Sequence, residues 1–456
     1  MKRLLSSWVF VAALAAVSCS AVRHCKAPEL DLPAAVVPGA VDSLTLADVE
    51  WWRFYGDTTL CGIIRRTLDR NRNIRAAAAR VEQMRQLYRI RKAERLPSVG
   101  INALADFETN DYYGESSKRD PELGLKATLG WELDLWGSLR WAKRKGEAEW
   151  LASVEDERAM RMTLIAEAAA AYFRLVALDS ELAIVRRTLA TRREGVAVAK
   201  LRFEGGLTSE IVYRQAQVEY ASTAALIPDL ENRIGITENA LSLLMGDYPG
   251  RTIPRSAVDM EGAVPDSVPV GLPSQLLQRR PDVRAAEQRL RSAMGDVGMA
   301  YADRFPRITF QLQGGLENDA LKGFFRSPFS YVAGQLAAPV FAFGRKKARY
   351  KAALAAYDQS RFGYEQKVLE VFKEADDAVS SYRSVRQTTV LKTHSRDAAR
   401  KYVELARLQY RTGSINYIDV LDAQRRYFDA QIGLSNAVRD ENLALVQLYK
   451  ALGGGW

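Results

Sequence analysis

Two stretches of the chain, LRFEGGLTSEIVYRQAQVEY at residues 201–220 and LQYRTGSINYIDVLDAQRRY at residues 408–427, are versions of one sequence. The residues that match at a constant offset of 207 are Gly137 with Gly344, Gly206 with Gly413, Ala216 with Ala423 and Tyr220 with Tyr427. Near the start of each half the offset is 209, as between Pro97 and Pro306. A fixed offset over so long a stretch predicts a tandem duplication. The predicted repeats are residues 57–245 and 274–456, joined by a Pro- and Gly-rich linker at 246–273.

Each repeat changes its hydrophobic period twice. Residues 57–94 are rich in Ala, Arg and Leu, which is helix composition. Alternating segments follow at about 97–110 and 122–136, with counterparts at about 306–318 and 329–343. Alternation of apolar and polar residues predicts strands with one apolar face.

Very long helices follow the strands. Residues 137–203 and 344–410 contain no proline, and each would form a helix of roughly 100 Å at ~1.5 Å per residue. A glycine turn then leads into a shorter helix, from Ser209 to about Met245 and from Ile415 to about Leu452. We expect two short helices to stack end to end beside each long one. A long coiled coil without a channel is the alternative, which the strand pairs disfavour.

The strands suit a membrane, although a half-buried strand in a soluble sheet alternates equally. Four strands cannot close a barrel, and an open sheet in lipid would leave backbone groups unpaired. Three chains would supply twelve strands. The sequence therefore predicts an α+β membrane protein with duplicated halves, in which a homotrimer shares a 12-stranded β-barrel. No part of the chain after the first residues has 18 consecutive apolar residues, so the sequence predicts no transmembrane helix.

The first residues are typical of an export signal. Lys2 and Arg3 precede an apolar run, and Ala16-Val17-Ser18-Cys19 resembles a lipobox. We expect residues 1–18 to be a lipoprotein signal peptide and residues 19–56 a lipidated N-terminal segment, with a covalent lipid on Cys19. Ordinary signal cleavage nearby, with Cys19 incidental, is the alternative.

Composition excludes several classes of function. The 456 residues are 48% apolar and 26% charged, as in folded proteins. Three Cys and two His leave little material for a disulfide framework, a metal site or a catalytic triad. The net charge of +10 falls to +8 without Lys2 and Arg3 and is spread along the chain. We therefore expect no enzyme, no metal or other cofactor besides the lipid, and no nucleic-acid partner.

Three segments carry a resemblance to a known family. They are Trp51–Asp57 (WWRFYGD), Leu272–Glu287 (LPSQLLQRRPDVRAAE) and Tyr410–Gln424 (YRTGSINYIDVLDAQ). With the duplicated halves, they resemble the outer membrane factor (TolC-like) family, in its branch of NodT-type efflux lipoproteins. The resemblance implies a homotrimer whose 12-stranded outer-membrane barrel continues into a long periplasmic α-helical barrel.

The resemblance also implies the function and its partners. The protein would be the exit duct of a tripartite efflux system, passively conducting small molecules such as drugs. A periplasmic adaptor and an inner-membrane pump would be its partners, with outer-membrane lipid around the barrel. A duct for secreted polypeptides, or a lipid-anchored periplasmic coiled-coil scaffold without a channel, are the alternatives.

The glycine turns would form the periplasmic tips that meet the adaptor. Gly206 and Gly413 suit a helix C′ position with positive φ, and Ser209 and Asn416 suit N-caps. By resemblance, the surface that contacts the adaptor comprises Gly206, Thr208, Ser209, Gly413, Ser414 and Asn416.

By the same resemblance, Asp419, Asp422, Tyr410 and Glu210 line the closed periplasmic aperture. Converging carboxylates would favour bound cations or raised pKa values. Alternatively, Asp419 complements the helix dipole. Ile415 stands where some relatives carry a gating Arg, which argues against a salt bridge there as the lock. We expect opening by hairpins that swing apart.

Overall fold

The computed structural model describes residues 25, 28–33, 35, 45–110, 113–114, 118–256, 269, 271, 273–338 and 341–456. Cys19 and the predicted signal peptide lie outside these residues, as does part of the predicted linker. The chain divides into two compact units. Unit 1 comprises Met1–Leu30, Ala79–Glu155 and Arg284–Lys367, and unit 2 comprises Asp31–Ala78, Asp156–Val283 and Val368–Trp456.

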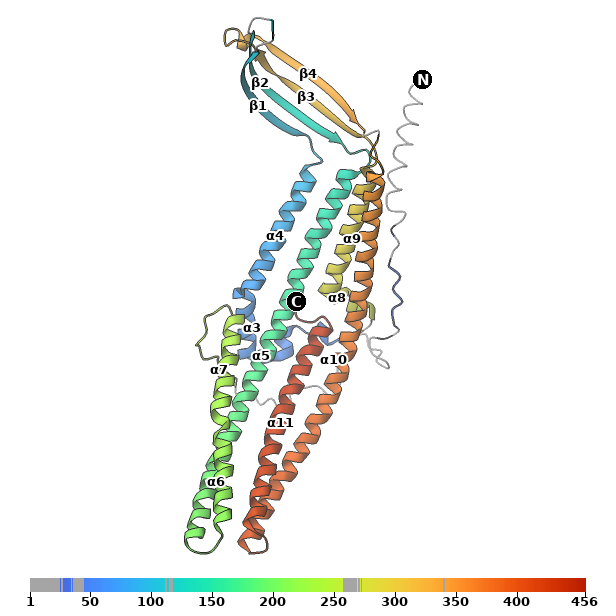
Figure 1. Ribbon diagram of the computed structural model, residues 1–456. Coiled ribbons are helices and arrows are strands. Elements are labelled where there is room, and N and C mark those ends of the chain that lie inside the picture. Colours follow the sequence, from blue (N-terminus) through green and yellow to red (C-terminus); the bar gives the residue numbers. More distant parts are fainter. Residues whose placement is uncertain are drawn as a thin grey trace. The chain divides into compact units, whose positions relative to one another are not determined.

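Unit 1 contains a four-stranded antiparallel sheet in the order β1-β2-β3-β4 (Figure 1). The strands are β1 (Ser98–Asn110), β2 (Lys118–Leu133), β3 (Arg307–Asn318) and β4 (Pro328–Ala337). A short 3-10 helix, η3 (Phe324–Arg326), lies between β3 and β4. The first two strands come from one repeat and the last two from the other, and they meet where β2 pairs with β3. Within the described residues, β1 and β4 are each paired along one edge only.

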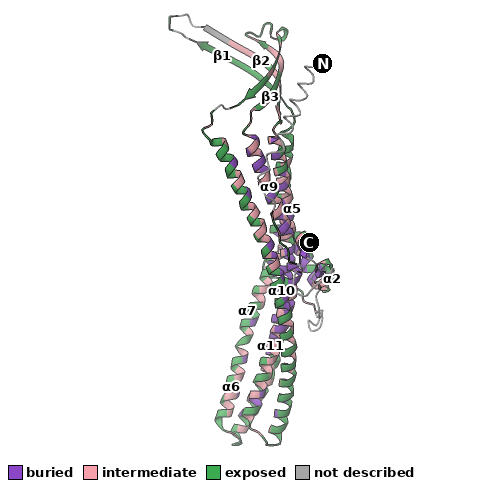
Figure 2. Cartoon of the chain, turned by 90° about the vertical axis from the view of Figure 1, so that its right-hand side faces the viewer, coloured by how far each residue is buried: buried purple, intermediate pink, exposed green. Residues whose placement is uncertain are grey.

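The register gives the sheet one apolar and one polar face. Leu129 of β2 pairs with Val99 of β1 and Leu312 of β3, and Leu312 pairs with Val332 of β4. Directly paired residues point to the same face, so these four side chains form an apolar row across the sheet. Val99 is 74% exposed and Val332 is 69% exposed in the single chain. Figure 2 likewise shows exposed and intermediate residues predominating on the strands.

Charged groups occupy the opposite face of the sheet. The Lys126 ammonium lies 3.0 Å from Glu122 on its own strand and 2.9 Å from Glu317 on β3. The polar positions of β3 face the same side as Lys126, because Gly315 is its paired residue. The apolar and polar faces therefore follow the alternation in the sequence.

Two strands end earlier than the sequence predicts. β2 stops at Leu133 rather than near 136, because the carboxylate of Asp134 accepts the backbone N–H groups of Leu139 (2.9 Å) and Arg140 (2.8 Å) in the first turn of α5 (Ser138–Glu204). β4 stops at Ala337 rather than near 343. Pro339, which follows two residues later, has no N–H to donate to a sheet ladder.

Helices α4 (Arg72–Ala93), α5, α9 (Pro281–Ala302) and α10 (Arg345–Arg411) contribute residues to unit 1. Gly298 of α9 lies so close to α5 that a Cβ at this position would stand 2.2 Å from Trp141. Leu290, Val297, Tyr350 and Tyr357 bury a core between α9 and α10. Small residues thus let the helices of this unit approach closely.

Unit 2 is built from helices. It contains η2 (Leu46–Asp48), α2 (Trp51–Tyr55), α3 (Thr58–Arg70), α6 (Glu210–Ala224), α7 (Leu226–Leu244), α8 (Pro273–Arg279) and α11 (Tyr417–Ala451), with the remaining residues of α4, α5, α9 and α10. α5 and α10 each run 67 residues, as the proline-free segments predict. Among the described residues, no helix has both the length and the apolar character needed to cross a bilayer.

Two helices predicted as continuous are broken. The segment 57–94 divides at Asn71, whose side chain donates to Leu244 O (2.9 Å) and accepts the N–H of Asn73 (2.9 Å). The helix after the first tip divides at Ala225, three residues before Pro228. A proline lacks the N–H that would bond four residues back, and its ring clashes with that carbonyl. The prediction of one helix from Ser209 to about Met245 is therefore wrong.

A buried arginine holds three helices of unit 2 together. Arg280, 4% exposed, lies between α8 and α9. Its Nη2 lies 2.6 Å from Asp282 at the start of α9 and 2.7 Å from Glu374 of α10, and its Nη1 donates to Ala451 O of α11 (3.0 Å). Pro281 is the first residue of α9, where a missing N–H is harmless. Residues 279–282 (RRPD) thus connect the start of α9 to α10 and α11.

Candidate functional site

The two tip turns of unit 2 close in the same way. Gly206 and Gly413 have φ of 73° and 79°. After α5, the N–H of Gly206 donates to Phe203 O (2.9 Å) and that of Leu207 to Arg202 O (2.8 Å). After α10, Gly413 donates to Tyr410 O (3.1 Å) and Ser414 to Gln409 O (2.9 Å). This pair of bonds is the Schellman motif, and it confirms both glycines as C′ residues.

The residues before the returning helices occupy the predicted N-cap positions. Ser209 and Asn416 have extended backbones, with ψ of 157° and 160°. The Ser209 side chain makes no capping hydrogen bond. The N–H of Asn416 donates to the Asp419 carboxylate (3.0 Å), so Asp419 closes the first turn of α11. Asp419 therefore acts on its own helix terminus, as the dipole alternative predicts.

Two hydroxyl groups lie in the second tip turn, between α10 and α11. The hydroxyls of Thr412 and Ser414 lie 3.1 Å apart, and the Thr412 hydroxyl also donates to Gln409 O (2.9 Å). In the first tip Thr208 is half-buried, whereas Ser209 is exposed. The residues predicted to contact the adaptor thus form two compact polar turns.

Arginines pair with two of the predicted aperture carboxylates, Asp422 and Glu210. Asp422 lies 2.5 Å from Arg425 and 2.7 Å from Arg426, measured from carboxylate oxygen to guanidinium nitrogen. Glu210 of the first tip pairs with Arg214 at 2.9 Å. These arginines were not predicted, although each follows its carboxylate by three or four residues, the spacing of neighbours on a helix.

The pKa of the Asp422 carboxyl is lowered, chiefly by its hydrogen bond to Arg426 and then by Arg425. Within one chain the groups next to Asp422 are cations, whereas the expectation of bound cations or raised pKa values concerns carboxylates of three converging chains and stays a prediction. The ion pairs of Asp422 are present above the ordinary Asp pKa of about 4 and are lost only as the pH falls through the lowered value. Asp422 is therefore ionised at neutral pH.

Tyr410 links the two tips. Its hydroxyl accepts a hydrogen bond from Nη1 of Arg202 at 2.6 Å, and the Arg202 guanidinium carbon lies 5.2 Å from the centre of its ring. Arg202 belongs to α5 and Tyr410 to α10, so one side-chain contact joins the two repeats. The Tyr410 ring also lies 5.3 Å from that of Tyr417 on α11. Arg202 is not among the residues that the sequence predicts for the aperture.

One face of α5 makes further contacts with α11. The guanidinium of Arg192 lies 5.3 Å from the centre of the Phe428 ring on α11. A Cβ at Gly195 would stand 2.8 Å from the Tyr417 hydroxyl. Arg192, Gly195 and Arg202 are spaced by three and seven residues, which places them along one side of the helix. This side of α5 therefore carries the junction between the tips.

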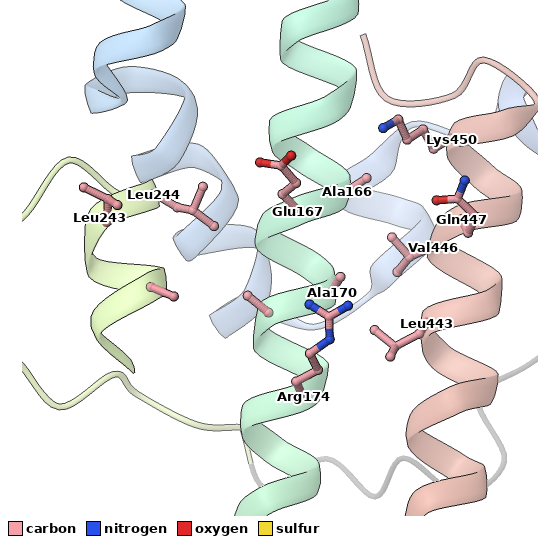
Figure 3. A pocket seen from close by; sticks show the side chains of 12 residues that line it. Ala166, Glu167, Ala170, Arg174, Leu243, Leu244, Leu443, Val446, Gln447 and Lys450 are labelled. Atoms are coloured by element: carbon pink, nitrogen blue, oxygen red, sulfur yellow. The ribbon is translucent and has the colours of Figure 1, made fainter. Parts of the chain in front are cut away.

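A cavity of about 620 Å³ lies between α5, α7 and α11. Figure 3 shows Leu443 and Val446 of α11 directed toward α5, with Glu167 and Arg174 standing out from α5. Alanines of α5, including Ala166 and Ala170, also line the cavity. Within the described residues, no cluster of His, Cys, Asp and Glu could hold a metal ion.

Comparison with known proteins identifies the family. The profile of the family described as outer membrane efflux protein matches residues 63–247 and 272–454, which together make up most of the chain. The chain belongs to the outer membrane efflux protein family. The two matched segments follow the two repeats, and between them lies most of the linker.

Relatives and a solved structure agree with this membership. The chain is 32% identical over 409 residues to the solvent efflux pump outer membrane protein SrpC of Pseudomonas putida, covering 88% of this chain and 87% of the relative. It is 30% identical over 445 residues to the probable outer membrane lipoprotein SilC of Salmonella typhimurium, covering 94% and 95%. The solved outer-membrane channel OprN superimposes with a TM-score of 0.87 at 28% identity, covering 95% and 99%.

The family sets the function and the location of this chain. It is an outer-membrane efflux protein. The predicted family, transport class and cellular location are thereby confirmed.

Proposed function

We propose that three copies of this outer-membrane efflux protein form one closed exit duct. The observation that carries the proposal is the four-stranded sheet, in which β1 and β4 are each paired along one edge only among the described residues. Pairing β4 of one copy with β1 of the next would close a twelve-stranded barrel and satisfy every ladder. The exposed row of Val99, Leu129, Leu312 and Val332 would then face lipid, and the side bearing Lys126 would face the aqueous lumen.

The helices would continue this barrel as an α-helical tunnel in the periplasm. A periplasmic adaptor and an inner-membrane pump would supply the cargo and the energy. The name of SrpC, a solvent efflux pump protein, supports small organic molecules as the cargo. The name of SilC, an outer membrane lipoprotein, supports a lipid on Cys19. The polar turns at Gly206, Thr208, Ser209, Gly413, Ser414 and Asn416 would be the surface that meets the adaptor.

The mass of the native oligomer tests this proposal. Protein extracted from the outer membrane in mild detergent is expected to have the mass of three chains by native mass spectrometry. The same preparation is expected to conduct ions in planar lipid bilayers. A single chain without conductance would contradict the duct and favour a periplasmic scaffold.

The predicted aperture has its own test. Asp419, Asp422, Glu210 and Tyr410 would surround the narrow periplasmic end, where three copies of each meet. Replacing both aspartates (Asp419→Ala with Asp422→Ala) removes the carboxylate that accepts the Asn416 N–H at the start of α11 and frees Arg425 and Arg426 from their partner. We expect a higher single-channel conductance in planar bilayers.

A matched control is Asp229→Ala, which removes an exposed carboxylate from the first turn of α7. Its conductance is expected to equal that of the unmodified protein. If the double variant also conducts like the unmodified protein, the assignment of the aperture to these residues fails.

A further inference from the structure

A second cavity in unit 2 is lined by arginines. It has a volume of about 390 Å³ and lies between α5, α10 and α11. Two of its arginines, Arg187 and Arg192, come from α5, and two, Arg400 and Arg407, come from α10. One carboxylate, Glu404, also lines it. The walls of this cavity, which we call the arginine cavity, are therefore strongly positive.

Two of the four arginines have their charge balanced by a neighbouring carboxylate. Arg192 is 8% exposed and lies 3.0 Å from the Glu219 carboxylate. Arg400 lies 4.0 Å from Glu404, which also pairs with Lys401 at 3.0 Å.

The other two arginines are uncompensated. Within the described part of the chain, neither Arg187 nor Arg407 forms an ion pair with a carboxylate. The one hydrogen bond described for the Arg187 guanidinium is donated by Nε to Ala183 O (3.3 Å), on its own helix. Guanidinium groups bind carboxylates and sulfonates through parallel N–H donors, so these two groups are suited to an anion.

Aromatic rings form the rest of the lining. Tyr427 and Phe428 both line the arginine cavity from α11. Phe428 packs against the buried cluster of Leu178, Leu182, Val185 and Leu230, and Tyr427 packs against the cluster around Val403 and Val420. Each ring is thus held by a separate part of the core and offers a rigid apolar surface.

The duplication did not produce this combination twice. At the offset of 207, Arg187 corresponds to His394 and Arg192 to Ala399. On the other wall, Phe428 corresponds to Ala221, while Arg400 and Arg407 correspond to Arg193 and Lys200. The equivalent position in the other repeat therefore keeps a tyrosine, Tyr220, but lacks the Phe428 ring and the buried arginine.

We propose that the arginine cavity binds a small organic anion with one aromatic ring and a carboxylate or sulfonate group. Arg187 and Arg407 hold the anionic group, and Phe428 and Tyr427 contact the ring. The volume lies within the usual range of small-molecule sites, roughly 300–1,000 Å³. All of the lining residues belong to one chain and one unit, so this site does not require the trimer or the duct proposed above.

The probe is para-trifluoromethylbenzenesulfonate. Its binding to the full-length protein in detergent is measured by fluorine NMR. Saturable line broadening is expected for this anion. The neutral para-trifluoromethylbenzyl alcohol, which shares the ring and the fluorines, is expected to show only the broadening that empty micelles cause. Equal saturable binding of both compounds, or none by the sulfonate at millimolar concentration, would overturn the proposal.

Variants then locate the site. Arg187→Gln with Arg407→Gln removes the two uncompensated charges and is expected to weaken binding about tenfold or more, since charge-assisted hydrogen bonds are lost. Phe428→Ala is expected to weaken it as well. The matched control, Arg193→Gln with Lys200→Gln, removes two positive charges at nearby positions outside the cavity lining and is expected to bind like the unmodified protein. Equal weakening by both double variants would mean general charge attraction and would refute the site.

Discussion

Replacing Arg202 with alanine is expected to raise the open probability of this efflux protein about tenfold or more in planar bilayers. The Arg202 side chain donates to the Tyr410 hydroxyl at 2.6 Å and lies against its ring, so it ties the tip of the first repeat to that of the second. A hydrogen bond from a charged donor contributes about 1.5–3 kcal/mol. A free energy of ~1.4 kcal/mol corresponds to a factor of ten in an equilibrium constant. Loss of this hydrogen bond would therefore raise the equilibrium constant for opening by about one to two orders of magnitude.

Further variants separate this contact from general damage to the tip. Tyr410→Phe keeps the ring and removes only the hydroxyl, so a smaller increase is expected. Arg202→Ala combined with Tyr410→Phe should then conduct no more than Arg202→Ala alone, because both changes remove the same contact. Arg193→Ala, an exposed arginine on the same helix, is the control. An additive double variant, or an Arg202→Ala channel that conducts normally, would exclude this contact as a brace of the closed state.

Replacing Arg280 with alanine is expected to lower the free energy of unfolding by about 2–4 kcal/mol, a little below the ~3–5 kcal/mol of a fully buried pair because Glu374 is partly exposed. The change removes the group that pairs with Asp282 and Glu374 and leaves Ala451 O without this donor. Thermal unfolding of the helices, followed by circular dichroism in detergent, measures the loss. Arg280→Lys keeps the charge but not the fork of donors, and it should restore only part of the stability.

The control for Arg280 is another ion pair of similar length. Arg186 lies 2.7 Å from Glu231, but both side chains are about half exposed, at 59% and 51%. Exposed pairs contribute about 0–1 kcal/mol, so Arg186→Ala is expected to leave the unfolding temperature nearly unchanged. Equal losses in the two variants would show that burial does not set the strength of the Arg280 cluster.

Local rules explain why much of the fold could be predicted. Gly206 and Gly413 could be assigned to helix ends because a glycine before a polar cap residue fits one backbone geometry. The alternation around Val99 and Leu312 identified the apolar face of the sheet, since the strand period of two is strict. The break before Pro228 was missed, although the residue itself signals a break. Arg425 and Arg426 beside Asp422 were also readable from helical spacing.

Other features depend on packing that no local pattern reveals. Arg202 and Tyr410 are 208 residues apart, and their contact exists because α5 and α10 come together in unit 2. Arg280 is part of a recognisable string, but its partner Glu374 lies 94 residues away on α10. The arginine cavity likewise combines residues of three helices, and its sequence signal is spread from Arg187 to Gln431. These sites become visible only in three dimensions.

The half-paired strands β1 and β4 have a consequence for biogenesis. Until an outer strand finds a neighbour, its free N–H and C=O groups are a template for any other extended chain, including a second newly exported copy in the wrong orientation. Productive assembly then competes with misassociation, and both depend on concentration. Overproduction of this protein should therefore yield aggregates before it saturates the membrane, and escort by periplasmic chaperones should matter most before the strands have paired.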